Sequence, residues 1–177
     1  MKKHIHFIIA LITISTGQLQ AQENQQCLQN LSIFAENAKV KNYTAAYEPW
    51  KLVKEECPKL NVAIYSYGER ILKDRLKNAT PADKAATEQA LLSLYDDWIT
   101  YFPTKKGVSE VGEILSSKAQ TMIDFKIGST KEVYAIFDRA YIEDANSFTN
   151  PKRLYNYFKT LYDTYKKGDN SVTTEML

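Results

Sequence analysis

Few residues of this chain have the type and spacing that enzyme chemistry requires. Its two histidines, His4 and His6, both lie within the first 21 residues. If that segment is removed, no histidine remains for acid–base catalysis near neutral pH or for zinc binding. The chain also lacks the glycine-rich loops that hold nucleotide phosphates. These absences argue against histidine-dependent catalysis, against a histidine-containing metal site and against a nucleotide cofactor.

Cys27 and Cys57 are the only cysteines, and they do not form a C-x-x-C redox motif. If the chain turns near Lys41 and Asn42, each cysteine lies about fifteen residues from the turn, so two antiparallel helices bring them to the same level. We therefore predict a disulfide that clamps the open end of the first helical hairpin, as an oxidising compartment allows. Two buried thiols are the alternative.

Carboxylates occur as adjacent pairs, Asp96-Asp97 and Glu55-Glu56. Neighbouring residues on a helix point about 100° apart, so neither pair faces a single site. We interpret both as solvated helix faces. A hydrolase would need two carboxylates contributed by different helices, as in glycan cleavage, and this remains an alternative.

Residues 1–21 have the composition of a secretory signal peptide. A basic start is followed by an apolar stretch over 7–14, and Ala21 offers a small residue for cleavage. The apolar stretch is short for a bilayer, so we predict cleavage, no remaining membrane span and a periplasmic or secreted protein. A retained membrane anchor and a lipid-modified Cys27 are less favoured alternatives.

Cleavage also changes the charge balance. The loss of Lys2 and Lys3 leaves 21 basic residues against 21 acidic residues, so the remaining chain is close to neutral. It contains no run of lysines and arginines that would match a phosphate backbone. We therefore expect no nucleic-acid partner.

A hydrophobic period of 3.6 residues predicts an all-α fold with seven helices. Helix starts are indicated by Thr80-Pro81 with Asp83, by Ser129 with Glu132 and by Asn150-Pro151. The helical domain would occupy 22–168, followed by a polar tail over 169–177. The expected helices are 26–40, 43–56, 61–78, 81–101, 108–126, 130–145 and 151–167.

Apolar stripes on these helices are expected to be buried by neighbouring helices, and the short connections favour antiparallel hairpins. Pro49 falls within the second helix, where we expect a kink, with a break into two elements as the alternative. Gly68 and Gly112 are interpreted as close helix crossings. The stripes are Tyr43, Ala46, Tyr47, Trp50 and Val53; Ala90, Leu91, Leu94, Tyr95 and Trp98; and Leu154, Tyr155, Phe158, Leu161, Tyr162 and Tyr165.

One spacing resembles the second helix of a tetratricopeptide repeat, in which aromatic, small and proline residues recur at fixed offsets. The residues that carry this resemblance are Tyr43, Ala46, Trp50, Val53 and Pro58. The pattern partly returns 45 residues later at Leu91, Tyr95, Trp98 and Pro103. The period exceeds that of the standard repeat, and Phe34 stands where a small residue is expected. The resemblance implies a divergent α-solenoid of helix hairpins.

More broadly, several segments are similar to exported tetratricopeptide-repeat-like proteins of Bacteroidota: the run from Cys27 to Lys39, Asn42-Tyr43, Pro49-Trp50, Cys57-Pro58, 67–72 and 148–151. Those proteins continue with further helices, so the chain resembles an N-terminal portion or a truncated form. The resemblance implies a repeat scaffold of the cell envelope and transfers no reaction.

Together these observations predict a non-enzymatic exported scaffold, without a cofactor, that binds a protein partner. Arg70, Lys73 and Arg75 form a dense basic stretch and a candidate partner-binding face. The last helix carries aromatic residues on more than one face, which suggests self-association. The alternative is a module that binds a glycan or small ligand through its tyrosines, of which the chain has 12.

Overall fold

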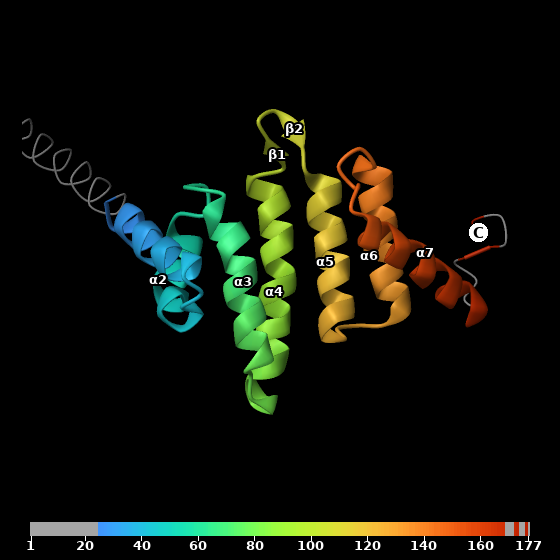
Figure 1. Ribbon diagram of the computed structural model, residues 1–177, viewed down its shortest axis with the longest axis horizontal. Coiled ribbons are helices and arrows are strands. Elements are labelled where there is room, and N and C mark those ends of the chain that lie inside the picture. The colour runs from blue at the N-terminus through green and yellow to red at the C-terminus, as the bar shows by residue number, and fades with distance from the viewer. Residues whose placement is uncertain (1–24, 169–171, 174–175, 177) are drawn as a thin grey trace, which may run out of the picture. The chain divides into compact units, whose positions relative to one another are not determined.

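The computed structural model describes residues 25–168, 172, 173 and 176 (Figure 1). The predicted signal peptide and most of the predicted tail lie outside these residues. The described part is helical apart from one short β-hairpin, which confirms the all-α class. Its helices are residues 25–39, α2 (Tyr43–Glu56), α3 (Ala63–Lys77), α4 (Pro81–Tyr101), α5 (Val111–Phe125), α6 (Thr130–Asp144) and α7 (Pro151–Lys166).

The chain divides into two compact units between Asn78 and Ala79. The first unit contains the helix over 25–39 together with α2 and α3. The second contains α4, the β-hairpin, α5, α6 and α7. Within each unit, helices that follow one another in the sequence pack together, as α2 does on α3, and as α5 does on α6.

In the first unit, a short turn joins the helix over 25–39 to α2. Lys41 takes a left-handed conformation there (φ 62°), and the side chain of Asn42 caps α2 by accepting from the amide of Ala45 at 3.3 Å. The turn therefore lies where the sequence predicted it. A disulfide joins Cys27 and Cys57, whose Cα atoms are 6.3 Å apart, and the predicted clamp is confirmed.

Trp50 links α2 to α3 in this unit. It is buried, and its indole Nε1 donates to the carbonyl oxygen of Ile64 at 2.6 Å. A Cβ on Gly68 would lie 2.5 Å from that indole nitrogen, so the predicted close crossing is confirmed. Pro49 lies inside a helix that is continuous from Tyr43 to Glu56, and the predicted alternative of two separate elements is wrong.

The connection after α4 differs from the prediction. The helix expected from residue 108 begins at Val111, because Val108–Ser109 pairs as an antiparallel strand with Thr104–Lys105. Lys106 and Gly107 both have positive φ (52° and 79°), as a two-residue hairpin turn requires. Strands this short carry no alternating pattern, so the hydrophobic period did not indicate them.

The second unit has its own core around α5 and α6. Phe137 stacks on Phe148 with ring centroids 5.8 Å apart, and Tyr157 of α7 packs against both rings. The predicted capping box at Ser129 and Glu132 is present at the start of α6. The buried residues of this core are Leu115, Ala119, Met122, Val133, Phe137, Ala140 and Phe148.

The apolar stripe expected to be buried on the last helix is the main error of the sequence prediction. Tyr155 is 65%, Phe158 54% and Tyr162 44% exposed. Of the expected stripe Leu161 is buried, and the other buried residues of α7 are Thr160 and Thr164. The two threonine hydroxyls donate to carbonyl oxygens of their own helix, so they can be buried without another partner. Ala90, expected in the stripe of α4, is also exposed.

Candidate functional site

The repeat-motif residues lie mostly in the packed interiors of the two units. Ala46, Trp50 and Val53 are buried in the first unit, and Leu91 and Tyr95 are buried in the second. The phenol of Tyr95 shares a hydrogen bond of 2.7 Å with the hydroxyl of Thr121. Tyr43, Pro58 and Trp98 are half-buried, and Pro103 is exposed.

Each member of the candidate basic face has a partner within the first unit. Lys73 pairs with Glu69 one turn earlier on α3. The guanidinium of Arg70 lies 5.4 Å from the ring centroid of Tyr67. That of Arg75 lies 3.6 Å from the ring centroid of Tyr47, a cation–π contact that ties α3 to α2. These side chains therefore support the local packing of the unit.

Asp96 is more than the solvated side chain that the sequence suggested. Both of its carboxylate oxygens accept from Nζ of Lys118, at 2.7 and 2.8 Å. Lys118 is only 8% exposed, whereas the side chain of Asp96 is 53% exposed. The ion pair joins α4 to α5. Sequence reasoning missed Lys118, because its position on the buried side of α5 depends on how the two helices pack.

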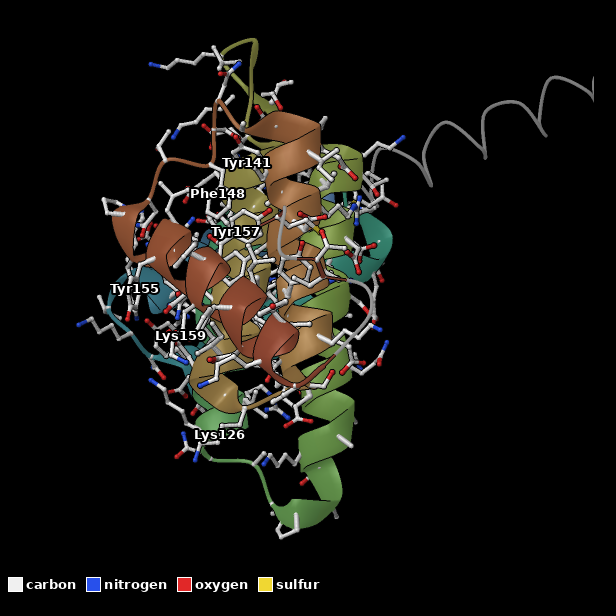
Figure 2. All side chains as sticks on the ribbon, turned by 90° about the vertical axis from the view of Figure 1, so that its right-hand side faces the viewer. Lys126, Tyr141, Phe148, Tyr155, Tyr157 and Lys159 are labelled. Atoms are coloured by element: carbon white, nitrogen blue, oxygen red, sulfur yellow. A yellow bond between two sulfur atoms is a disulfide. The ribbon has the colours of Figure 1, made fainter. Side chains whose placement is uncertain are left out.

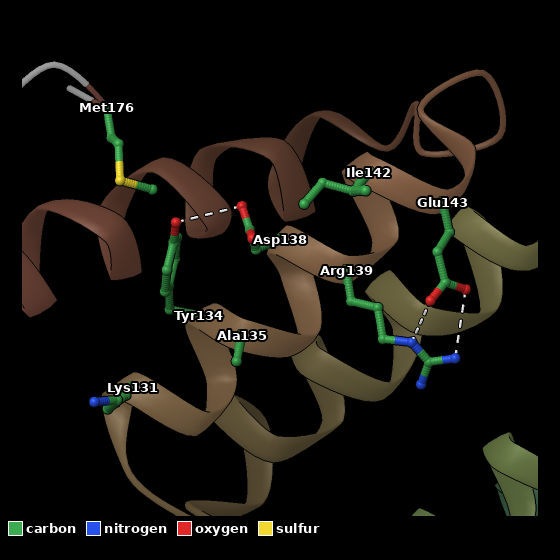
Figure 3. A pocket seen from close by; sticks show the side chains of 8 residues that line it. All are labelled: Lys131, Tyr134, Ala135, Asp138, Arg139, Ile142, Glu143 and Met176. Carbon is green, nitrogen blue, oxygen red and sulfur yellow. Dashed lines mark hydrogen bonds and ion pairs between the residues drawn. The ribbon is translucent and has the colours of Figure 1, made fainter. Parts of the chain in front are cut away.

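A groove of about 390 Å³ runs along the outer side of α6 (Figure 3). Most of its lining comes from positions three or four apart on α6, with Met176 of the C-terminal segment at one end. Val172 of the same segment is buried against Tyr134 and Leu161. The lining residues are Lys131, Tyr134, Ala135, Asp138, Arg139, Ile142, Glu143 and Met176.

The charged groups of this groove are already held by neighbours. Asp138 accepts from the phenols of Tyr134 at 3.3 Å and Tyr157 at 2.7 Å, and Arg139 is held by Glu143. Burial, followed by the interactions with Asp138, raises the pKa of both tyrosines. Both phenols are therefore protonated donors at neutral pH, and neither tyrosine is activated as a nucleophile or a general base.

A second hollow, of about 540 Å³, lies beside the β-hairpin and the start of α5. Asp144 and Ser147 line it, and both cap the first turn of α5. Asp144 Oδ2 accepts from the amide of Gly112 at 3.3 Å, and Ser147 Oγ accepts from the amide of Glu113 at 3.1 Å. The last residue of α6 and the connection to α7 thus accept hydrogen bonds from α5 amides that its N-cap residue, Glu110, does not bind through its side chain.

The pKa of the Asp144 carboxylate lies below its ordinary value. Burial raises its pKa, but hydrogen bonds from the side chains of Ser147 and Ser109 and from the amides of Gly112 and Ser147 outweigh that effect. A Cβ on Gly112 would lie 2.1 Å from the carbonyl oxygen of Asp144, which confirms the close crossing predicted for this glycine. The hydrogen bonds of this carboxylate join the end of α6 and the following connection to the start of α5.

Arg153 fixes the start of α7 on α5. It forms an ion pair of 2.7 Å with Glu113 and donates to the hydroxyl of Ser116 at 3.0 Å. Glu113 also lines the second hollow, so this ion pair lies at its edge. The network has a structural role, and sequence reasoning missed it because the partners lie about forty residues apart.

The most distinctive surface of the second unit is the outer side of α7, which we call the α7 face: Leu154, Tyr155, Phe158 and Tyr162. All four side chains are exposed, and they lie within nine residues of one helix. Tyr155 and Lys159 can be located on this helix in Figure 2, which looks onto α7. Tyr157, in contrast, packs between α7 and the core. A gathered set of exposed rings is typical of an interaction surface.

Across the described residues, no group of histidine, cysteine, aspartate and glutamate side chains is arranged to hold a metal ion. Within the same residues, no helix is both long and apolar enough to cross a membrane.

Comparison with family models, with curated proteins and with solved structures found no match for this chain.

Proposed function

We propose that this chain is a non-enzymatic, exported helical-repeat scaffold that binds a protein partner in the periplasm or cell envelope. The observation that carries the proposal is the α7 face. Three aromatic rings are exposed within two turns, while the same helix turns two threonines inward. Aromatic side chains at the centre of an interface contribute much of the binding energy in protein complexes.

The contacts of the other candidate residues are consistent with a scaffold. The charged groups whose contacts are described above hold helices, caps and turns together. The Cys27–Cys57 disulfide supports export, because disulfides persist in oxidising compartments. The helix hairpins, with small and aromatic residues at their contacts, support a divergent tetratricopeptide-like arrangement.

The test is affinity capture of partners from solubilised envelopes of the source organism, using the exported form of the chain. The matched variant carries Tyr155→Ser, Phe158→Ser and Tyr162→Ser, which alter exposed side chains and are expected to leave the helical circular dichroism unchanged. We expect a stoichiometric partner with the wild-type chain and none with the variant. Equal recovery with both chains would exclude the α7 face, and the absence of any partner above an unrelated exported helical protein would contradict the scaffold.

A glycan-binding module is the second candidate, because exposed tyrosine rings also stack on sugars. Tyr155 and Tyr162 on α7 and Tyr141 on α6 are the exposed tyrosines that favour it. Isothermal titration calorimetry with envelope oligosaccharides separates the two candidates. Saturable binding that the triple serine variant loses would favour the glycan module.

A further inference from the structure

We propose that the α7 face is a docking site for an acidic amphipathic helix of a partner protein. This inference rests on the proposed function and specifies the chemistry of the partner. It is carried by two features of the exposed side of α7: the spacing of its aromatic residues and the position of its lysines.

The spacing of the exposed aromatic residues matches the seam of a coiled coil. Tyr155, Phe158 and Tyr162 follow one another at intervals of three and four residues, which are the intervals between successive a and d positions of a heptad. If Tyr155 is assigned to a, then Phe158 occupies d and Tyr162 occupies the next a. A regular seam of this kind suits the side of another helix, whose own apolar residues repeat at the same spacing.

The lysines of α7 flank this seam on one side. In the same assignment, Lys152, Lys159 and Lys166 occupy three successive e positions, seven residues apart. The positions beside a coiled-coil seam carry the charges that select the partner. Asp163 is the only acidic residue within α7, and it pairs with Lys159. The edge of the seam is therefore cationic and complements carboxylates on an incoming helix.

The other ion pair on this edge is weak enough to be exchanged. Nζ of Lys152 lies 3.8 Å from Asp124, and the two side chains are 70% and 46% exposed. Nζ of Lys166 lies 5.6 Å from the ring centroid of Tyr162, so a cation already borders the aromatic seam. Lys126, at the end of α5 and labelled in Figure 2, adds a further exposed lysine to the second unit.

The lysines of α7 also argue against binding of a second copy of this chain to the α7 face. In a two-fold antiparallel pair of α7 helices, the e positions of one helix lie beside the e positions of the other. Such a pair would place three lysines against three lysines with one aspartate on each side, and like charges across a seam are unfavourable. In a parallel pair, the lysines would face the opposite edge of the other helix, where Leu154 carries no charge and Leu161 is buried within its own unit. An acidic helix provides both the apolar and the charged complement.

The test uses two labelled three-heptad peptides that differ only in charge, with leucine at a and d and either glutamate or lysine at e and g. Like charges at e and g oppose pairing of each peptide with itself. Binding to the exported form of the chain is followed by fluorescence anisotropy. We expect the glutamate peptide to bind about tenfold more tightly than the lysine peptide, the effect expected of three exposed ion pairs.

Two triple variants with equal net charge separate the α7 face from general electrostatics. Lys152→Glu, Lys159→Glu and Lys166→Glu should reverse the preference between the peptides. The control, Lys77→Glu, Lys105→Glu and Lys106→Glu, changes exposed lysines elsewhere and should keep the wild-type preference. The serine variant at Tyr155, Phe158 and Tyr162 should bind neither peptide.

Several outcomes would overturn the inference. These are the absence of binding, equal binding of both peptides, or an equal effect of the two lysine triples. Binding of the α7 face to phosphatidylglycerol vesicles without peptide binding would identify a membrane surface instead. A dimer in sedimentation that Phe158→Ser dissociates, again without peptide binding, would identify a second copy. A partner captured from envelopes that neither α7 variant affects would retain the proposed scaffold and overturn this inference alone.

Discussion

Gly112→Ala is the substitution that most directly tests how the second unit is held together. Gly112 lies in the first turn of α5, where the connection between α6 and α7 crosses the helix. An alanine Cβ would lie 2.1 Å from the carbonyl oxygen of Asp144 and 2.9 Å from Oγ of Ser147. The first of these is a backbone atom, so the clash cannot be relieved by a side-chain rotation. The connection must move away from α5.

The expected loss of stability combines three effects. Overpacking of a well-packed contact costs about 1–3 kcal/mol. Movement of the connection also weakens the hydrogen bonds that the first-turn amides donate to Asp144 and Ser147, and loss of a helix cap costs about 0.5–2 kcal/mol. In the opposite direction, alanine is favoured over glycine within a helix by about 1 kcal/mol. The clash and the lost cap outweigh the helix propensity, and we expect a net destabilisation of about 2 kcal/mol.

The assay is urea unfolding of the full chain, followed by circular dichroism, with Gly107→Ala as the matched control. Gly107 lies in the hairpin turn at φ 79°, and nothing lies within 4 Å of the position of its missing Cβ. Its substitution introduces only backbone strain of about 1–2 kcal/mol, and a hairpin outside the core should transmit little of it. A Gly112→Ala chain with wild-type or higher stability would refute the proposed contact.

Three further predictions concern the disulfide, a carboxylate and a buried lysine. Reduction of the Cys27–Cys57 disulfide should lower the stability of the first unit by about 3–4 kcal/mol on the loop-entropy model, and equal urea midpoints with and without reductant would contradict this. The folded pKa of Asp144 lies below its unfolded value near 3.8, so the stability it contributes is complete above that value and is lost as the pH falls through the folded pKa. Asp144→Asn should therefore flatten the dependence of the urea midpoint on pH below about 5, and an unchanged slope would contradict the assignment. Asp96→Ala should destabilise more than Lys118→Met in urea unfolding, because it leaves a buried ammonium without its carboxylate, whereas the exposed Asp96 can regain water; the reverse order would show that the pair is not the main contact of Lys118.

The helices and the disulfide were predictable because their causes are local. A cap such as Ser129 with Glu132 acts within one turn. The helices α4, α6 and α7 each have a predicted cap, and each begins at the predicted residue. The cysteines required only one further assumption, that the chain turns near Lys41. The two helical glycines were correctly interpreted as crossings, although the sequence did not reveal the partners of Gly68 and Gly112.

The β-hairpin and the orientation of α7 were not predictable in the same way. The hairpin depends on positive φ at Lys106 and Gly107, and a lysine does not indicate this conformation. On α7, hydrophobicity assigns the rings of Phe158 and Tyr162 to the core. The helix instead buries Thr160, whose hydroxyl can be buried since it donates to the backbone of its own helix.

The candidate site itself was only partly within reach of the sequence. The sequence indicated that the last helix had apolar residues on more than one face, and it suggested an additional neighbour. It did not show which residues remain exposed, since this depends on how α7 packs on α5 through Arg153 and Glu113. The groups that hold α5, Asp144 and Ser147, lie more than thirty residues from the amides they cap.

The most direct test of the central claim is photo-cross-linking in intact envelopes, with a benzophenone side chain introduced at Phe158. The control carries the same side chain at Val40, an exposed apolar residue of the first unit. We expect the chain labelled at position 158 to form a discrete cross-link with a protein whose attached segment is an acidic amphipathic helix. No cross-link from position 158, with one from position 40, would contradict the account and move the partner-binding surface to the first unit.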